Sequence, residues 1–123
     1  MDRLLEERIA RNDATFRQAN ERISAAAETY RVDMPVPFIC ECADPKCSEI
    51  VRLTLEEYEE IRADSRHFFH IDGHRDADGT AGVVVAERDS YVIVEKTGHA
   101  GEIAQALDER NPHEGLERSA ADD

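Results

Sequence analysis

The chain has 123 residues and a net charge of −13, because 28 acidic residues outweigh 15 lysines and arginines. Residues 1–31 hold six arginines and six acidic residues, so the whole negative excess lies in residues 32–123. Protein affinity for nucleic acids comes mainly from cations that neutralise phosphates, so this charge argues against binding to DNA or RNA. The sequence contains no apolar run near the roughly 20 residues that span a bilayer and no signal-peptide-like start. We therefore expect a cytoplasmic protein that contacts no membrane.

Residues 3–30 are predicted to form one long helix. Its apolar positions recur every seven residues and form a narrow heptad seam, which consists of Ile9, Phe16, Ile23 and Tyr30 and is flanked by Leu5, Asn12, Ala19 and Ala26. Two i,i+4 pairs, Glu7 with Arg11 and Asp13 with Arg17, are expected to support its exposed face. The seam either packs against the helix's own domain or associates with a partner helix, and an asparagine in a seam often sets the oligomeric state.

Short strands and short helices are predicted after this helix. Pro35 and Pro37 end it, a strand over residues 38–40 leads into a cysteine-rich turn, and residues 49–53 return beside that strand. Thr54 and Glu57 form a capping box, which predicts a helix to about residue 63.

A second set of strands is predicted in the later part of the chain. Residues 68–71 form a strand followed by a turn at 72–74, and residues 83–87 and 91–95 form a β-hairpin. A helix over residues 100–110 stops before Pro112. The predicted fold class is α+β, with a long N-terminal helix, a cysteine-bearing knuckle hairpin, a short helix, a small antiparallel sheet and a C-terminal helix. The expected division is an N-terminal amphipathic helix (1–31), an α+β domain that contains the knuckle (32–110) and a disordered acidic tail (111–123).

Three cysteines, Cys40, Cys42 and Cys47, lie within eight residues and are the only cysteines in the sequence. Thiolates bind Zn²⁺ in a tetrahedral cage, and a short turn lets three of them converge. A histidine can supply the fourth ligand. His74 is the best placed of the five histidines, because the preceding Gly73 gives the backbone freedom to aim it after a strand. His70 ranks second and His67 third, whereas His99 lies at the start of the predicted last helix and His113 in the tail. The sequence therefore predicts a zinc site formed by Cys40, Cys42, Cys47 and His74.

Other interpretations of the cysteines are open. The thiols can be ordinary core residues, or a redox switch can pair Cys47 with Cys40 or Cys42. A catalytic zinc site is disfavoured because three cysteines and a histidine close the coordination shell, although Glu41 and Glu49 lie near enough to suggest a general base. The sequence contains no phosphate-binding loop, dinucleotide fingerprint or nucleophile elbow. We therefore expect that the protein is not an enzyme.

The cysteine motif is part of a longer pattern. The pattern consists of F-I-C-E-C-A-D-P-K-C at residues 38–47, L-T-L-E-E-Y-E at residues 53–59, Gly73-His74, and V-I-V-E-K at residues 92–96. It resembles a family of small uncharacterised bacterial proteins that carry C-E-C-x4-C, L-T-x-x-E-Y-E, a G-H turn and V-V-E-K, over residues 8–110. The resemblance implies that Cys40, Cys42, Cys47 and His74 act as one unit, and it implies no activity. Asp72 departs from the family, which tends to have proline there.

These observations predict a small cytoplasmic zinc-binding protein with a structural metal site. Its role would be that of a non-catalytic protein-interaction or regulatory module, with a thiol-based redox or metal-responsive switch as the alternative. A protein partner or a second copy could bind through the N-terminal helix.

Overall fold

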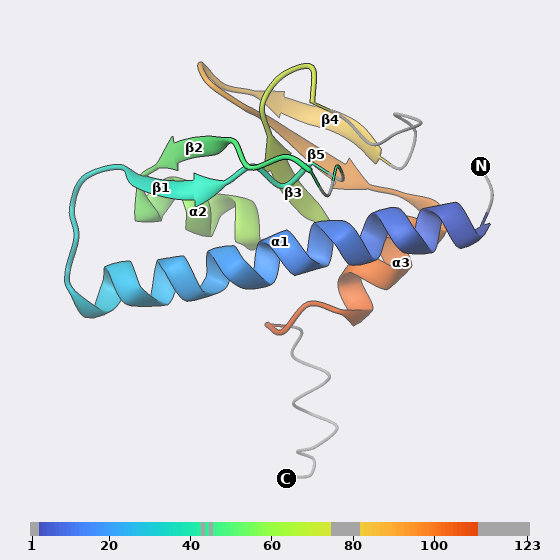
Figure 1. Cartoon of the computed structure of the whole chain (residues 1–123), viewed down its shortest axis with the longest axis horizontal. Coiled ribbons are helices and arrows are strands. Elements are labelled where there is room, and N and C mark those ends of the chain that lie inside the picture. Colours follow the sequence, from blue (N-terminus) through green and yellow to red (C-terminus); the bar gives the residue numbers. More distant parts are fainter. Residues whose placement is uncertain (1–2, 43, 45, 75–81, 111–123) are drawn as a thin grey trace, which may run out of the picture.

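The computed structural model describes residues 3–42, 44, 46–74 and 82–110 (Figure 1). In chain order the elements are α1 (Arg3–Thr29), β1 (Val36–Ile39), β2 (Ile50–Leu53), α2 (Leu55–Arg62), β3 (His67–His70), β4 (Gly82–Glu87), β5 (Val92–Lys96) and α3 (Gly98–Ala106). The fold is α+β, as predicted from the sequence. The expected tail at 111–123 and most of the loop expected before β4 lie outside the described residues.

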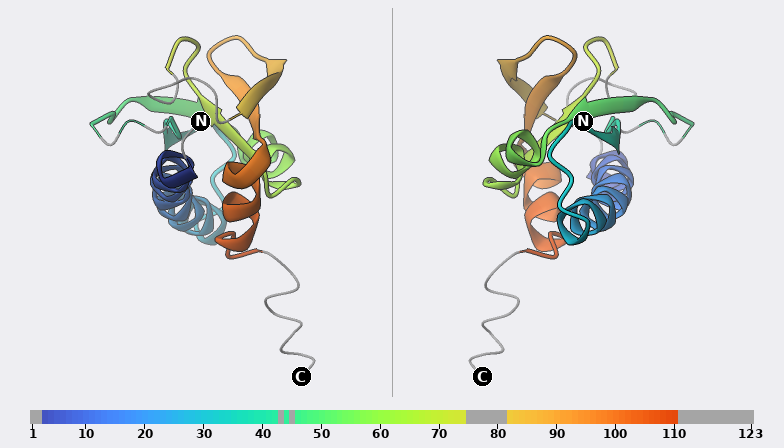
Figure 2. Two further views of the ribbon diagram at one scale, coloured as in Figure 1. Left: turned by 90° about the vertical axis from the view of Figure 1, so that its right-hand side faces the viewer. Right: turned by 90° about the vertical axis from the view of Figure 1, so that its left-hand side faces the viewer.

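The strands form two small antiparallel sheets. One pairs β1 with β2, and the other has the order β3-β5-β4, so β5 is its central strand. The helix α1 runs along the molecule and contacts α3, β1 and α2. Viewed along α1, the strands lie above the helices (Figure 2). The long helix therefore packs against elements from both sheets' side of the molecule and against both short helices, chiefly through α3, β1 and α2.

Most predicted elements are present with shifted bounds. The capping box of α2 is confirmed, because the Glu57 backbone N–H donates to Thr54 Oγ1 at 3.1 Å and the Thr54 N–H donates to Glu57 Oε1 at 2.8 Å. Strand β1 starts two residues earlier than expected and includes Pro37, whose side chain is exposed. A two-stranded sheet tolerates proline because each of its strands has one unpaired edge. Helix α3 starts at Gly98, not at residue 100, and ends at Ala106.

Aromatic residues from several elements form the centre of the core. The rings of Phe38 on β1 and Tyr58 on α2 stack with centroids 4.4 Å apart. Phe69 on β3 packs edge-on against both rings and also against Tyr91 at the start of β5. These contacts join the two sheets and α2 around the strand that leads into the cysteines. Aromatic pairs of this kind stabilise a core by about 0.5–1.5 kcal/mol beyond their burial.

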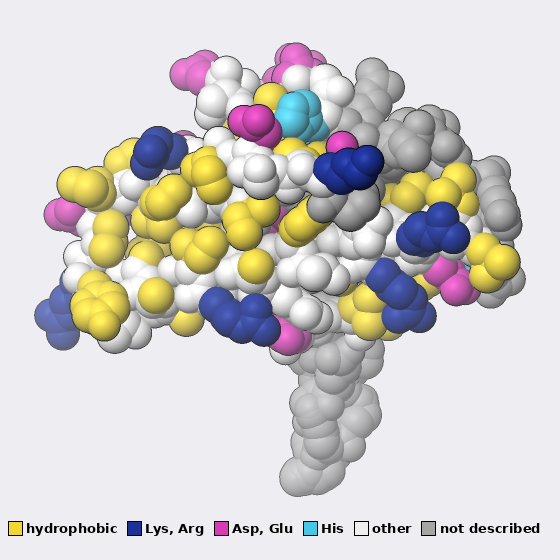
Figure 3. Space-filling model, viewed as in Figure 1, with side chains coloured by type: hydrophobic (Ala, Val, Ile, Leu, Met, Phe, Trp, Pro, Cys, Tyr) yellow, Lys and Arg dark blue, Asp and Glu magenta, His cyan; other side chains and the backbone are white. Residues whose placement is uncertain are grey.

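The buried face of α1 differs from the predicted heptad seam. Of the seam residues Ile9 is buried, Phe16 and Ile23 are half-buried, and Tyr30 is 79% exposed. The face that packs against the domain is offset from the seam and consists of Ile9, Ala10, Asp13, Ala14, Arg17, Asn20, Ser24 and Ala27. Hydrophobic periodicity missed this face because half of it is polar. Hydrophobic side chains are visible across the front of the molecule (Figure 3).

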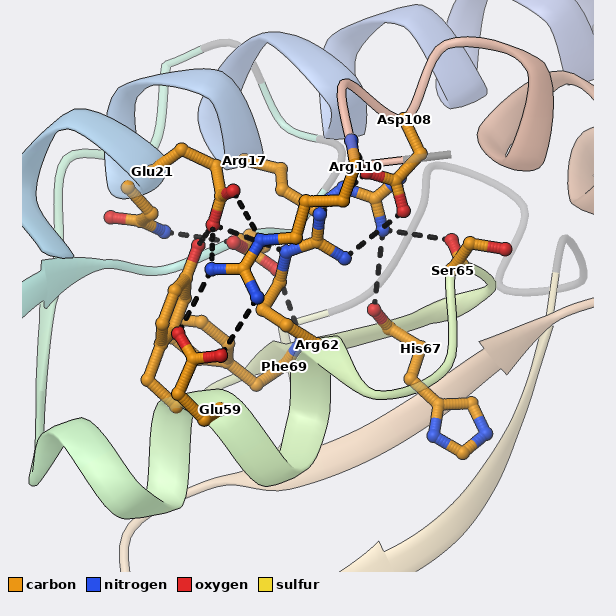
Figure 4. A network of polar contacts seen from close by, with 12 residues as sticks. Arg17, Glu21, Glu59, Arg62, Ser65, His67, Phe69, Asp108 and Arg110 are labelled. Carbon is orange, nitrogen blue, oxygen red and sulfur yellow. Dashed lines mark hydrogen bonds and ion pairs between the residues drawn. The ribbon is translucent and has the colours of Figure 1, made fainter. Parts of the chain in front are cut away.

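A network of polar contacts anchors α1 to α2 and to the end of α3 (Figure 4). Arg62 donates to both carboxylate oxygens of Asp108, at 2.6 and 3.2 Å, and both side chains are buried. Glu21 on α1 accepts hydrogen bonds from Arg62, from Arg110 and from the Tyr58 hydroxyl. The carboxylates and guanidinium groups therefore satisfy one another inside the fold, as buried charges require.

A second polar cluster joins α1 to β5 and α3. Asp13 forms an ion pair of 2.7 Å with Lys96, and both side chains are buried. Arg17 donates to the Ala104 carbonyl at 3.0 Å and lies 4.0 Å above the centre of the Phe68 ring. Asp13 and Arg17 were expected on an exposed face, and that expectation is wrong. Partners on distant elements make their burial tolerable.

Candidate metal centre

The turn between β1 and β2 positions the three cysteines. The Cys40 N–H donates to the Glu49 carbonyl at 2.9 Å, which extends the pairing of the two strands by one residue. Within the turn, the Cys47 N–H donates to the Asp44 carbonyl at 3.0 Å, and the Lys46 N–H donates to Asp44 Oδ1 at 2.9 Å. An aspartate that accepts from the residue two positions later is typical of a tight turn. The chain therefore doubles back and brings Cys47 beside Cys40.

A separate turn after β3 brings His74 to the cysteines. Gly73 has a φ of +92°, a conformation that favours glycine, and the His74 N–H donates to the Ile71 carbonyl at 2.9 Å. The sequence-based expectation of a Gly-His turn is therefore confirmed. The turn places His74 Nδ1 3.7 Å from Cys40 Sγ and 3.6 Å from Cys47 Sγ.

The structure thus brings all four predicted site residues together. The sulfur atoms of Cys40, Cys42 and Cys47 and a ring nitrogen of His74 all lie within 4.8 Å of one another. Cys40 and Cys42 are buried, whereas Cys47 and His74 are half-buried. The four residues are close enough to hold one metal ion.

The two distances from His74 to the sulfurs agree with those around a tetrahedral zinc ion. Zinc binds cysteine sulfur at about 2.3 Å and histidine nitrogen at about 2.05 Å, and a tetrahedral angle then separates sulfur from nitrogen by about 3.6 Å. The distances from His74 Nδ1 to the sulfurs of Cys40 and Cys47 are 3.7 and 3.6 Å. The donor set, three thiolates and one imidazole, is the Cys₃His set of structural zinc sites.

The surroundings of the three thiols shift their pKa values in different directions. Hydrogen bonds from the Cys42 thiol and from the Ile71 N–H, which lies 3.4 Å from Cys40 Sγ, lower the pKa of Cys40. The hydrogen bond to Cys40, together with burial, raises the pKa of Cys42, and burial raises that of Cys47. Metal ligands must be deprotonated, so a bound metal ion would have to displace the protons of these thiols.

Asn20 on α1 supports the cysteine turn, and the sequence did not reveal it. Its side-chain amide donates to the Ile39 carbonyl at 2.8 Å and accepts from the Ile39 N–H at 2.8 Å, as a neighbouring strand would. The same amide donates to Glu41 Oε2 at 2.9 Å, and the Phe69 N–H lies 3.4 Å from Glu41 Oε1. The only sequence signal is a run of polar residues at helical spacing, Asp13, Arg17, Asn20 and Ser24, which is usually a solvent-exposed face.

Glu41, considered above as a general base, is almost completely buried. Burial raises the pKa of its carboxyl group to about 7, and the hydrogen bond from Asn20 opposes this shift. Glu49, the other carboxylate considered, is exposed at the rim of the cysteine turn. Glu41 therefore connects the cysteine turn to α1 and β3 through its hydrogen bonds.

The other described histidines have partners away from the cysteines. His67 Nε2 lies 3.1 Å from Glu95 Oε1, His99 Nε2 lies 3.0 Å from Glu7 Oε2, and His70 Nδ1 lies 2.8 Å from the Ile71 carbonyl. Asp64, His67 and Glu95 form a second group with donor atoms close together, but it offers three ligands on a partly exposed surface. His113 lies outside the described residues.

No family model, curated protein or solved structure matches the chain. Among the described helices, none combines the length and apolarity needed to cross a membrane. The case for a function therefore depends on the cluster itself.

Proposed function

We propose that the protein is a cytoplasmic zinc-binding module whose metal is structural and whose role is non-catalytic, in protein interaction or regulation. The convergence of four donor atoms within 4.8 Å, from two turns far apart in the sequence, carries this proposal. Reduced thiols in the cytoplasm keep such a set available to metal. The resemblance to small bacterial proteins with the same C-E-C-x4-C and G-H elements is part of this proposal.

Zinc suits these donors better than other common divalent ions. Three sulfurs and one imidazole form a soft set, whereas Mg²⁺ and Ca²⁺ require oxygen ligands. Bound zinc would cross-link the β1–β2 turn to the turn after β3, and such a link stabilises a small domain because the unfolded chain lacks a preformed site.

Cobalt substitution tests the coordination directly. Cobalt(II) bound in place of zinc should show intense visible bands of tetrahedral geometry together with thiolate-to-metal charge transfer. Cys42→Ser should weaken the charge-transfer absorption, whereas Ser48→Ala, at the rim of the same pocket, should leave the spectrum unchanged. A weak octahedral spectrum, or a Cys42→Ser spectrum identical to that of the native chain, would contradict the proposal.

One observation favours a redox switch as the second candidate. Cys42, Cys47 and His74 line a surface pocket of about 360 Å³, so small oxidants can reach the metal ligands. In such a switch, two thiolates, one hydrogen peroxide molecule and two protons would give one disulfide and two water molecules, and zinc would be released.

Peroxide treatment separates the two candidates. A metal-sensitive dye follows zinc release, and mass spectrometry without reductant follows disulfide formation. Zinc retention under mild peroxide supports the structural role. Stoichiometric zinc release with a disulfide between Cys47 and Cys40 or Cys42, reversed by thiol reductant, supports the switch.

A further inference from the structure

The charged residues of α1 differ between its two sides: carboxylates with partners lie toward the rest of the fold, and exposed arginines lie on the other side. Of its described carboxylates, three contact groups on other elements. Glu7 lies 3.0 Å from His99 Nε2, and Asp13 forms an ion pair of 2.7 Å with Lys96. Glu21 accepts hydrogen bonds from three side chains of the polar network. Three carboxylates of the helix, Glu7, Asp13 and Glu21, therefore have partners within the fold.

The opposite side of α1 carries an arginine stripe, which consists of Arg8, Arg11 and Arg22. All three are exposed, and a helical repeat of about 100° per residue places them within about 60° of one another around the axis. Within the described part of the chain, none of the three forms an ion pair. Glu28 is also exposed, but it lies about 100° or more around the axis from these arginines.

Exposed apolar side chains accompany the arginine stripe. Leu4 is 70% exposed at the start of α1, and Tyr30 and Met34 are 79% and 62% exposed just beyond its end. On the same view of the molecule, cationic side chains are spaced along α1 and hydrophobic side chains lie between them and toward β1 and β2 (Figure 3). Apolar groups next to unpaired cations, in a chain with a net charge of −13, are unusual enough to suggest an interaction surface.

We propose that this side of α1 binds an acidic amphipathic helix of a partner protein. Carboxylates of such a helix would pair with the arginine stripe, and its apolar residues would cover Leu4, Tyr30 and Met34. A second copy packed α1 to α1 would place arginine against arginine. Membranes and nucleic acids are extended polyanions that the acidic remainder of the chain repels, whereas a short helix contacts the stripe alone.

A fluorescent peptide with glutamates on one helical face and leucines on the other is the probe. It should bind the full-length, zinc-loaded chain, and more weakly as salt is raised. The variant Arg8→Gln/Arg11→Gln/Arg22→Gln should bind about tenfold more weakly, because it loses three exposed ion pairs. Arg88→Gln, on the loop between β4 and β5, should leave the affinity unchanged. Circular dichroism and zinc content should show that both variants fold.

Four results would overturn the proposal. The first is no binding to the native chain, and the second is equal binding to the triple variant. The third is tighter binding to phosphatidylserine vesicles or to duplex DNA than to the peptide. The fourth is peptide binding that appears only after Glu114, Glu117, Asp122 and Asp123 are replaced by the corresponding amides. That result would mean that the arginine stripe binds the acidic C-terminal residues of the same chain.

Discussion

The ring of His74 differs from the other described histidine rings in its contacts. It faces two sulfurs, whereas His67, His70 and His99 contact carboxylate or carbonyl oxygens. We expect His74→Ala to release zinc to a competing chelator much more readily than the native chain. Alanine substitutions at the other three positions should leave zinc retention nearly unchanged. Loss of metal from His70→Ala alone would reassign the fourth ligand.

Asn20 gives a prediction about a residue that touches no metal. Asn20→Ala leaves the Ile39 N–H, the Ile39 carbonyl and the Glu41 carboxylate without this partner, and each unsatisfied buried group costs about 1–3 kcal/mol. We expect the variant to lose about 2–3 kcal/mol of stability in denaturant titration and to release zinc faster. Gln18→Ala on the same helix is the control. If Asn20→Ala is as stable as that control, the hydrogen bonds of Asn20 to Ile39 and Glu41 do not contribute to the stability of the fold.

The sequence predicted the four candidate ligands because the two turns that carry them have local sequence signals. Two turns, one around Asp44 and one at Gly73, bring the donors together, and turn residues are visible in a sequence. Asn20 could not be predicted, because its role depends on which segment of the chain lies against α1. The same holds for Glu41, whose burial follows from the position of that helix.

Elements as a whole were predicted more reliably than the faces by which they pack. The cap of α2 and the β4–β5 hairpin have strong local signals, and both are present. The buried side of α1 mixes apolar and polar residues in equal number, so hydrophobic periodicity indicated a different face. Charged side chains are buried there because partners such as Lys96 and Ser65 come from elements distant in sequence.

Arg62 and Asp108 form a buried ion pair where α2 contacts the end of α3. Removal of one partner leaves a buried charge, so Arg62→Met should destabilise the fold by roughly 3–5 kcal/mol in denaturant titration. The double variant Arg62→Met/Asp108→Leu should be less destabilised than Arg62→Met. If it is more destabilised, the pair is not the source of the effect.

The same pair predicts a pH dependence. Burial raises the pKa of Asp108, but hydrogen bonds from Arg62 and from the Arg110 N–H outweigh burial and hold the pKa below its usual value. A carboxyl with a lowered folded pKa contributes stability above its unfolded pKa, near 3.9, and loses that contribution as the pH falls through the folded pKa. Thermal unfolding of Asp108→Asn should therefore depend less on pH below about 4 than that of the native chain. Glu56→Gln, on an exposed part of α2, should keep the native slope.

At the scale of the whole molecule, a small core is combined with a cluster that joins two distant turns. The chain is short enough that burial alone gives a modest margin of stability, and a metal cross-link would add to that margin. The excess of negative charge lies in residues 32–123, outside α1. The proposed metal site and the arginine stripe share no residue, so the triple arginine variant should keep its metal.

The central claim is that one zinc ion, held by Cys40, Cys42, Cys47 and His74, stabilises this fold. Native mass spectrometry of the full chain, paired with thermal unfolding before and after chelation, tests it most directly. We expect one zinc ion per chain and a clearly lower unfolding temperature after chelation, restored when zinc is returned. A chain that is metal-free after mild purification under reducing conditions, and that unfolds at the same temperature with or without zinc, would contradict the claim.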